Sequence, residues 1–316
     1  MMPPTSTLQD PAAESAVAGP RWRDRLAIPP IESPFLDEAL DNADLPDDVR
    51  ETVRKLGRDG YLVFDLDLPD FEERADRILA DLGPRYGEER RIAEAWYWND
   101  DVRALACAPK VLDILRLVYQ RDPIPFQTLN FERGSEQPAH SDAIHFHSLP
   151  RHYMSGVWIA FEDIHPDSGP LIGYPGSHLL PDLDMQDLGV PSEPEYYGAY
   201  EEYIRDMMKA RHEEPEVLLM KRGQAVLWLT NFLHGGTAIR GPDRTRHSMV
   251  THYYFEGCQY YFPMQSDLSA GRITRREVID LRDGSFVQHL HDGEPVDLGD
   301  LSKVCTYPRP LPDWVH

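Results

Sequence analysis

Apolar positions in the first third of the chain repeat with the spacing of amphipathic helices. They predict a helix over residues 46–57, a second over 71–82, and a third helical region over 100–119 that restarts at Pro109. Residues 61–67, with the sequence YLVFDLD, lie between the first two helices and have the composition of a strand. The N-terminal third is therefore predicted to be largely helical.

Beyond Pro125 the pattern changes to short runs of β-branched and aromatic residues separated by glycine, proline or aspartate. One predicted helix, over about 196–212, interrupts these runs. The predicted strands have the sequences FQTLNFE, SGVWIAFEDI, PLIGYP, QAVLWLTNFL and HSMVTHYYFEG. Helices followed by strands indicate an α+β fold, in which a β-sandwich or jelly roll carries helices packed outside it.

Charge and cysteine content narrow the class of protein. The 316 residues carry a formal net charge of -22, which argues against nucleic acid or an anionic membrane as the main partner. The three cysteines, Cys107, Cys258 and Cys305, fit neither a disulfide framework nor a zinc ribbon. Since no secretory signal or transmembrane run is visible, we expect a cytoplasmic protein that acts on a small molecule.

The predicted domain organisation is simple. Residues 1–20 are small, polar and proline-rich, and we expect them to form a disordered tail. Residues 21–45 contain three prolines and are expected to run extended over the surface. Because the chain shows no internal repeat and no second core, residues 21–316 are predicted to form one domain.

The segment QPAHSDAIHFHSLP, residues 137–150, is the strongest sign of chemistry. His140 and Asp142 are two positions apart, so an extended segment would direct both side chains to the same side. A later histidine, His234, follows an apolar strand and precedes two glycines. Two histidines and one carboxylate on one face of a metal ion form the ligand set of non-haem Fe(II) oxygenases.

Other histidines are weaker candidates for ligands. The patterns at 165–167 and 212–214 also pair a histidine with an acid, but they lie in a predicted turn and at a helix end. His145 and His147 have the opposite strand parity to His140, so we expect neither to bind the metal. His145 is instead a candidate for the substrate pocket.

A possible anion site follows the second half of the metal motif. Arg246 comes twelve residues after His234, and Ser248 follows in a strand-like segment. A buried guanidinium with a neighbouring hydroxyl is what a dicarboxylate cosubstrate requires. Arg244 is the alternative guanidinium.

In these motifs the chain resembles the phytanoyl-CoA dioxygenase (PhyH-like) family of Fe(II)/2-oxoglutarate-dependent oxygenases. The matching segments occur in family order over residues 125–255. They are QTLNF, QPAHSD, VWIAFEDIHPDSGPLIGYPGSH, NFLHGG and RHSMVTHY. The resemblance implies a double-stranded β-helix, which is a jelly-roll form, and one dioxygenase domain over 21–316.

The resemblance also implies roles for single residues. Fe(II) would be held by His140, Asp142 and His234. The far carboxylate of 2-oxoglutarate would be bound by Arg246, with Ser248 beside it. Gln127 matches a family position that faces the site.

The implied reaction is an oxidation that consumes 2-oxoglutarate and O2 and releases succinate and CO2. Since Asp142 supplies a carboxylate where halogenating relatives have a small residue, hydroxylation of a C–H bond is expected, or a related desaturation or ring formation. A zinc-dependent hydrolase or lyase, and a non-catalytic jelly-roll binding protein, are the alternatives for the same three residues.

The substrate is predicted only by class, as a small specialised metabolite of a bacterial biosynthetic route. An acyl-CoA would need a basic patch, and the arginine-rich segment 271–276 is the candidate for one. Trp158 and Trp228 are weak candidates for the substrate pocket. Other aromatic residues that could line it are Tyr153, Tyr174 and Tyr254.

Overall fold

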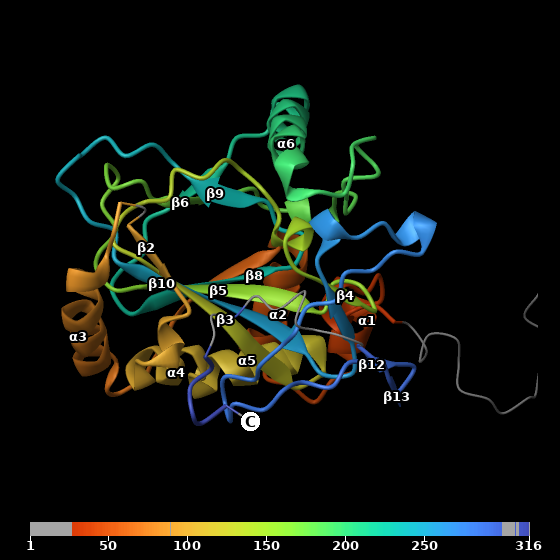
Figure 1. Ribbon diagram of the computed structural model, residues 1–316, viewed down its shortest axis with the longest axis horizontal. Helices are drawn as coiled ribbons and strands as arrows, with labels where there is room; N and C mark the ends of the chain where they lie inside the picture. The colour runs from red at the N-terminus through yellow and green to blue at the C-terminus, as the bar shows by residue number, and fades with distance from the viewer. Residues whose placement is uncertain (1–26, 89, 299–306, 308–309, 316) are drawn as a thin grey trace, which may run out of the picture.

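The structure is a computed structural model that describes residues 27–88, 90–298, 307 and 310–315. The tail predicted over residues 1–20 lies outside the described residues. In Figure 1 the main sheet crosses the middle of the molecule, most helices lie on one side of it, and a smaller sheet lies on the other.

The described part of the N-terminal third contains five α-helices, of which the last four occur where the apolar pattern predicts them. They are α1 (Leu36–Asp41), α2 (Asp47–Asp59), α3 (Phe71–Leu82), α4 (Asp100–Ala106) and α5 (Pro109–Tyr119). The Asn99 side chain accepts a hydrogen bond from the Val102 amide and so caps α4, and Pro109 begins α5. The prediction that residues 21–45 run extended is wrong for α1, where Leu40 is buried in the core.

The main sheet has six antiparallel strands in the order β1-β8-β5-β10-β3-β2. Their bounds are β1 (Tyr61–Asp65), β8 (Gln224–Leu229), β5 (Met154–Ala160), β10 (Ser248–Phe255), β3 (Pro123–Phe131) and β2 (Arg91–Ala93). The central strand β10 is buried along its whole length. Every strand predicted from the second half of the chain contributes to this sheet or to the smaller one.

Alternation along the central strands separates two layers of packing. Val157, Ile159 and Leu227 point from β5 and β8 toward the helices. Trp158 and Trp228 occupy the intervening positions and pack on the opposite face, toward the smaller sheet. The site described below lies on this second face.

The smaller sheet has three antiparallel strands in the order β7-β6-β9. They are β7 (Glu216–Leu218), β6 (Leu171–Gly173) and β9 (His234–Gly236), and α6 (Tyr197–Arg211) lies beyond them in Figure 1. Two facing antiparallel sheets with helices outside form the α+β jelly roll that the sequence predicts, and that prediction is confirmed.

Short strands complete the structure toward the C-terminus. β4 (His147–Leu149) pairs with β11 (Gln259–Tyr261), and β12 (Leu290–His291) pairs with β13 (Glu294–Pro295). Among the described residues, no helix combines the length and apolar character needed to cross a membrane.

Candidate metal and cosubstrate site

His140 and His234 meet although 94 positions separate them in the sequence, because their backbones pair directly. The amide of His140 donates to the His234 carbonyl at 2.9 Å, and the His234 amide donates back to the His140 carbonyl at 3.0 Å. The ring centroids are 4.6 Å apart. Since His234 is the first residue of β9, the edge of the smaller sheet fixes the position of both rings.

The Asp142 side chain lies beside the His140 and His234 rings and is supplied by a tight turn. Ser141 has an extended backbone conformation, and Asp142 begins the 3-10 turn η6 (Asp142–Ile144). The Oδ1 atom of Asp142 lies 3.9 Å from Nε2 of His140 and 3.8 Å from Nε2 of His234. Two imidazole nitrogens and one carboxylate oxygen therefore converge on one point, and all three residues are buried.

Hydrogen bonds on the far side of each ring set the tautomer. Nδ1 of His140 lies 2.9 Å from the carbonyl oxygen of Pro138, and Nδ1 of His234 lies 3.1 Å from that of Phe232. A carbonyl oxygen can only accept, so each Nδ1 carries the proton and each Nε2 keeps its lone pair. The Gln137 amide nitrogen, 3.2 Å from Nε2 of His140, fits this assignment.

Burial keeps both histidines neutral. It lowers the pKa of His140 to about 4, and the neighbouring His234 ring acts in the same direction. Burial also lowers the pKa of His234. Neutral imidazoles with free Nε2 lone pairs are the form that binds a metal ion.

Asp142 is held as a carboxylate by its surroundings. Burial alone would raise its pKa, but His234 and His252 hold the pKa of Asp142 well below its usual range. Its Oδ2 atom accepts a hydrogen bond from the Trp228 indole at 2.7 Å and lies 3.5 Å from Nε2 of His252. Oδ1 is thus the oxygen that faces the two histidines.

Arg246 enters the same cavity as a buried cation. It is 2% exposed, and its Nη1 donates to the Gly169 carbonyl at 2.9 Å, while its Nε has no hydrogen-bond partner. Burial lowers its pKa to about 10, which leaves it charged at neutral pH. Glu162 opposes that effect, but its oxygens bind the Thr245 hydroxyl and the His247 amide.

Among the residues that the structure describes, no carboxylate oxygen lies within 4.0 Å of the Arg246 guanidinium. The alternative arginine, Arg244, is exposed. Burying a cation without a counter-ion is costly, so the Arg246 position calls for an anionic ligand.

One small cavity, of about 80 Å³, joins these groups. It is lined by Leu129, Phe131, Ser135, Gln137, His140, Asp142, Trp158, Leu171, Trp228, His234, Gly235, Arg246, Val250 and His252. Ser248 begins β10 on the same face as Val250, and its hydroxyl donates to the Arg246 carbonyl at 3.3 Å. Gln127 on β3 pairs with His252 on β10, two residues beyond Val250 along β10.

The remaining predicted residues are placed as follows. The His145 ring lies 5.7 Å from that of His140 and 5.0 Å from that of Tyr197, beside the site. Trp158 lines the cavity close to Arg246. Trp228 also lines it, but its indole N–H is used by Asp142.

A second cluster with metal-ligand chemistry consists of His147, His152 and Asp182. Nε2 of His147 lies 2.7 Å from Oδ2 of Asp182, and Nδ1 of the same ring accepts from the Ser148 amide, so Nε2 carries the proton. His152 bridges Glu32 and Asp182. Protons already occupy the positions that a metal would need, so this cluster is a hydrogen-bonded clamp.

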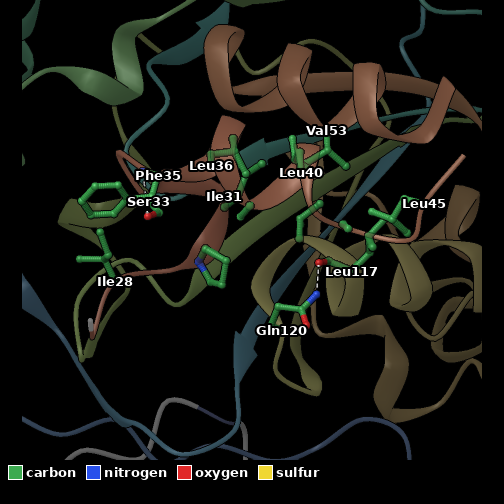
Figure 2. A pocket seen from close by; sticks show the side chains of 14 residues that line it. Ile28, Ile31, Ser33, Phe35, Leu36, Leu40, Leu45, Val53, Leu117 and Gln120 are labelled. Atoms are coloured by element: carbon green, nitrogen blue, oxygen red, sulfur yellow. Dashed lines mark hydrogen bonds between the residues drawn. The ribbon is translucent and has the colours of Figure 1, made fainter. Parts of the chain in front are cut away.

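An apolar cavity lies apart from both clusters. It has a volume of about 430 Å³ and lies between the first helices and α5, as Figure 2 shows. Its lining includes Ile31, Leu40, Val53 and Leu117, and no acidic, basic, histidine or cysteine side chain. It therefore offers no group for catalysis.

Sequence reasoning missed His252 and Gln137. His252 lies four positions after Ser248 in β10, so both side chains are on the same face of the strand. Strand alternation could therefore have predicted that His252 faces the site. Gln137 lies only three positions before His140, but nothing in its type indicated a contact with the ring. In the segment 271–276, the candidate for a basic patch, Arg276 is buried at 1% exposure and Arg272 is paired with Asp267.

Comparisons with known proteins agree with this architecture. A family model described as phytanoyl-CoA dioxygenase (PhyH) matches residues 58–248. Phytanoyl-CoA dioxygenase domain-containing protein 1 of Mus musculus is 31% identical over 113 residues, which cover 34% of this chain. The match spans only 38% of that mouse protein.

Two solved structures share the fold. The non-heme alpha ketoglutarate dependent carbocyclase SnoK from nogalamycin biosynthesis has a TM-score of 0.55 at 17% identity, covering 75% of this chain and 95% of its own. The epimerase SnoN from the same biosynthesis has a TM-score of 0.53 at 17% identity, covering 81% of this chain and 98% of its own. Because the family model matches more than half of the chain, this protein belongs to the phytanoyl-CoA dioxygenase family, whose members are Fe(II)/2-oxoglutarate-dependent oxygenases.

Proposed function

We propose that the protein is a non-haem Fe(II)/2-oxoglutarate-dependent hydroxylase in which His140, Asp142 and His234 bind the iron. Arg246 binds the far carboxylate of 2-oxoglutarate, with Ser248 beside it. The observation that carries the proposal is that a three-ligand cluster and a buried guanidinium, with no carboxylate partner among the described residues, line one cavity. A zinc hydrolase would need the three metal ligands, but its reaction would not require a buried guanidinium beside them.

The donor set fits iron. Two neutral imidazoles and one carboxylate on one side of the ion are the facial arrangement of non-haem Fe(II) oxygenases, in which other positions stay open. The hydrogen bonds behind each ligand are of the kind that fixes a metal site. They come from Pro138, Phe232 and Trp228.

When bound, the iron supplies the activation of O2 that is coupled to decarboxylation of 2-oxoglutarate. The chain's own residues do the rest. Trp228 directs Oδ1 of Asp142 toward the metal position, and Arg246 sets the direction in which a dicarboxylate enters. Leu129, Phe131 and Val250 exclude water from the cavity.

The expected oxidation inserts one oxygen atom into a C–H bond of the substrate. The presence of Asp142 supports this, because a full set of three protein ligands leaves no ligand position for a halide. SnoK and SnoN are named a carbocyclase and an epimerase, so related folds are associated with other outcomes. The product mass separates them: hydroxylation adds an oxygen, ring closure removes two hydrogens, and epimerisation changes nothing.

The substrate that we propose is a small specialised metabolite, handled by a cytoplasmic enzyme. The net charge of -22 does not suit nucleic acid or an anionic membrane surface. A CoA thioester lacks support as well, because Arg272 is paired with Asp267 and Arg275 contacts Gln259.

The test is an anaerobic titration of the metal-free protein with Fe(II) and then 2-oxoglutarate, followed through the visible charge-transfer band of the chelate. We expect the band in the wild type and in Arg244→Gln, which is the matched control with an exposed arginine. His234→Ala should abolish it. Arg246→Gln should require about 10- to 100-fold more 2-oxoglutarate, since a charge-assisted pair is lost.

Two outcomes would contradict the proposal. One is a wild-type protein that retains zinc and gives no band with Fe(II) and 2-oxoglutarate. The other is a band whose dependence on 2-oxoglutarate is the same in Arg246→Gln as in Arg244→Gln.

A further inference from the structure

A second buried arginine, Arg276, is connected to the metal cluster through Phe146 and His252. Arg276 is 1% exposed, and its Nε and Nη2 atoms have no hydrogen-bond partner. Within the part of the chain that the structure describes, no carboxylate lies within 4.0 Å of its guanidinium. Two unpaired N–H groups and a charge in the protein interior are costly unless a ligand satisfies them.

The unpaired atoms form one edge of the guanidinium. Nε and Nη2 point the same way, and this edge is a planar fork that matches the two oxygens of a carboxylate. The faces of the group are covered by aromatic rings. The guanidinium carbon lies 4.7 Å from the ring centroid of Phe126, 4.9 Å from Phe146 and 5.4 Å from Phe262.

Other unpartnered polar atoms surround this position. Oε1 of Gln127, the hydroxyl of Tyr254 and Nδ1 of His252 are buried and have no hydrogen-bond partner. His252 and Tyr254 share one face of β10, and the Tyr254 ring stacks on Phe126 at 4.0 Å. The charge of Arg276 also acts on the Tyr254 hydroxyl, lowering a pKa that burial raises.

Two side chains in series connect Arg276 to the predicted metal ligand Asp142. The Phe146 ring lies against Arg276 on one side and 5.0 Å from the His252 ring on the other. His252 in turn lies 3.5 Å from Asp142. A molecule anchored on Arg276 would therefore extend toward the metal position over an aromatic surface.

Glu94 is the structural alternative as a counter-ion. Burial raises the pKa of Glu94, and Arg276 acts to lower it, so the two groups sense each other. The Glu94 carboxylate, however, already accepts from the Trp96 indole and from the Thr128 amide. It leaves the Nε–Nη2 edge of Arg276 unpaired.

We propose that Arg276 binds a carboxylate group of the substrate that is oxidised, with the Tyr254 hydroxyl as an additional hydrogen-bond donor. The substrate is then an apolar or aromatic carboxylic acid whose rings or chain lie against Phe126 and Phe146. This proposal names the substrate class of the function proposed above and rests on it. Arg246 and Arg276 then bind different anions, the cosubstrate and the substrate.

The test uses 3-phenylpropanoate and its neutral isostere 3-phenylpropanamide as probes, titrated calorimetrically into the metal-free, full-length protein. Wild type should bind the carboxylate at least about tenfold more tightly than the amide, because only the carboxylate makes charge-assisted bonds. Arg276→Gln should lose this preference. Arg246→Gln, the matched change at the other buried arginine, should keep it.

A second variant, Tyr254→Phe, tests the proposal even if Arg276→Gln does not fold. Tyr254→Phe removes only a hydroxyl that has no partner, so its thermal midpoint should match that of the wild type. Its affinity for the carboxylate should fall about 3- to 10-fold, while its affinity for the amide stays the same.

The proposal is overturned if wild type shows no preference for the carboxylate. It is also overturned if Arg276→Gln keeps the preference, or if Arg246→Gln alone removes it. Since the protein carries no metal in this experiment, the result is independent of whether iron and 2-oxoglutarate bind. Failure of the substrate assignment and failure of the oxygenase assignment are thus separated.

Discussion

The indole nitrogen of Trp228 lies 2.7 Å from Oδ2 of Asp142, and this hydrogen bond decides which carboxylate oxygen faces the two histidines. Trp228 comes from β8 in the main sheet, whereas Asp142 comes from the turn η6. The bond therefore links the main sheet to the ligand that the turn η6 supplies. It is one of the outer hydrogen bonds that orient metal ligands in proteins.

Trp228→Phe should weaken Fe(II) binding by about 10- to 100-fold, the usual effect of removing an outer partner of a metal ligand. The ring is kept, so packing changes little while the hydrogen bond is lost. Fe(II) affinity is measured by anaerobic competition with a chromophoric chelator. Trp158→Phe is the matched control, because the Trp158 indole nitrogen has no partner and its loss should leave the affinity unchanged. Equal losses in both variants would contradict the role of the Trp228 bond.

Gly156 makes room for Trp228. The two residues are direct neighbours on β5 and β8, and a Cβ atom at position 156 would lie 2.5 Å from the indole ring. Gly156→Ala should therefore displace the indole from Asp142, lower the free energy of unfolding by about 1–3 kcal/mol and weaken Fe(II) binding. Chemical denaturation and the chelator assay measure the two effects.

Gly198→Ala is the control for Gly156→Ala. It lies in α6, and a Cβ atom there meets nothing within 4 Å. This change should leave Fe(II) binding intact and raise helix stability slightly. If Gly156→Ala behaves like Gly198→Ala in both assays, the close approach of Gly156 to Trp228 has no consequence.

His152 should make stability depend on pH. Burial lowers its pKa, but hydrogen bonds to Asp182 and Glu32 outweigh burial and raise the pKa from 6.5 to about 10. A group with a raised pKa in the folded state stabilises fully below pH 6.5 and loses that contribution as the pH rises through about 10. The size of the effect is on the order of 2–4 kcal/mol.

The measurement is the free energy of unfolding of wild type and His152→Gln between pH 6 and pH 10.5. The difference between the two proteins should be largest at the acidic end and shrink toward the alkaline end. Iron ligands are not involved, because His152 belongs to the clamp with Asp182. A difference that is constant with pH would show that His152 is not charged in the folded protein.

The sequence predicts the fold well because the helical period of about 3.6 residues and the strand period of two residues are both clear in its apolar positions. The helical stripe of Val53 and Leu56 and the alternation around Trp158 are local signals, and each alone predicts an element. The short helix α1 escaped prediction since prolines surround it, and its burial of Leu40 depends on contact with α2.

Local spacing also indicates the pair His140 and Asp142, and the structure brings these side chains together with His234. Spacing works here because Ser141 has an extended conformation, which directs its two neighbours to one side. The partners that tune the site are different. The hydrogen bond of Trp228 to Asp142 and the contact of Phe146 with Arg276 join segments far apart in the sequence, and the tertiary fold determines both.

Among the described residues the protein has two clusters of metal-ligand type and two buried arginines without carboxylate partners. The proposed function assigns the iron to one of these clusters and 2-oxoglutarate to one of these arginines. An anaerobic crystal of the protein with Fe(II) and 2-oxoglutarate, measured at the iron absorption edge, tests both at once. The account predicts one anomalous peak among His140, Asp142 and His234, with the far carboxylate of 2-oxoglutarate on Arg246. A peak among His147, His152 and Asp182, or 2-oxoglutarate bound to Arg276, would contradict it.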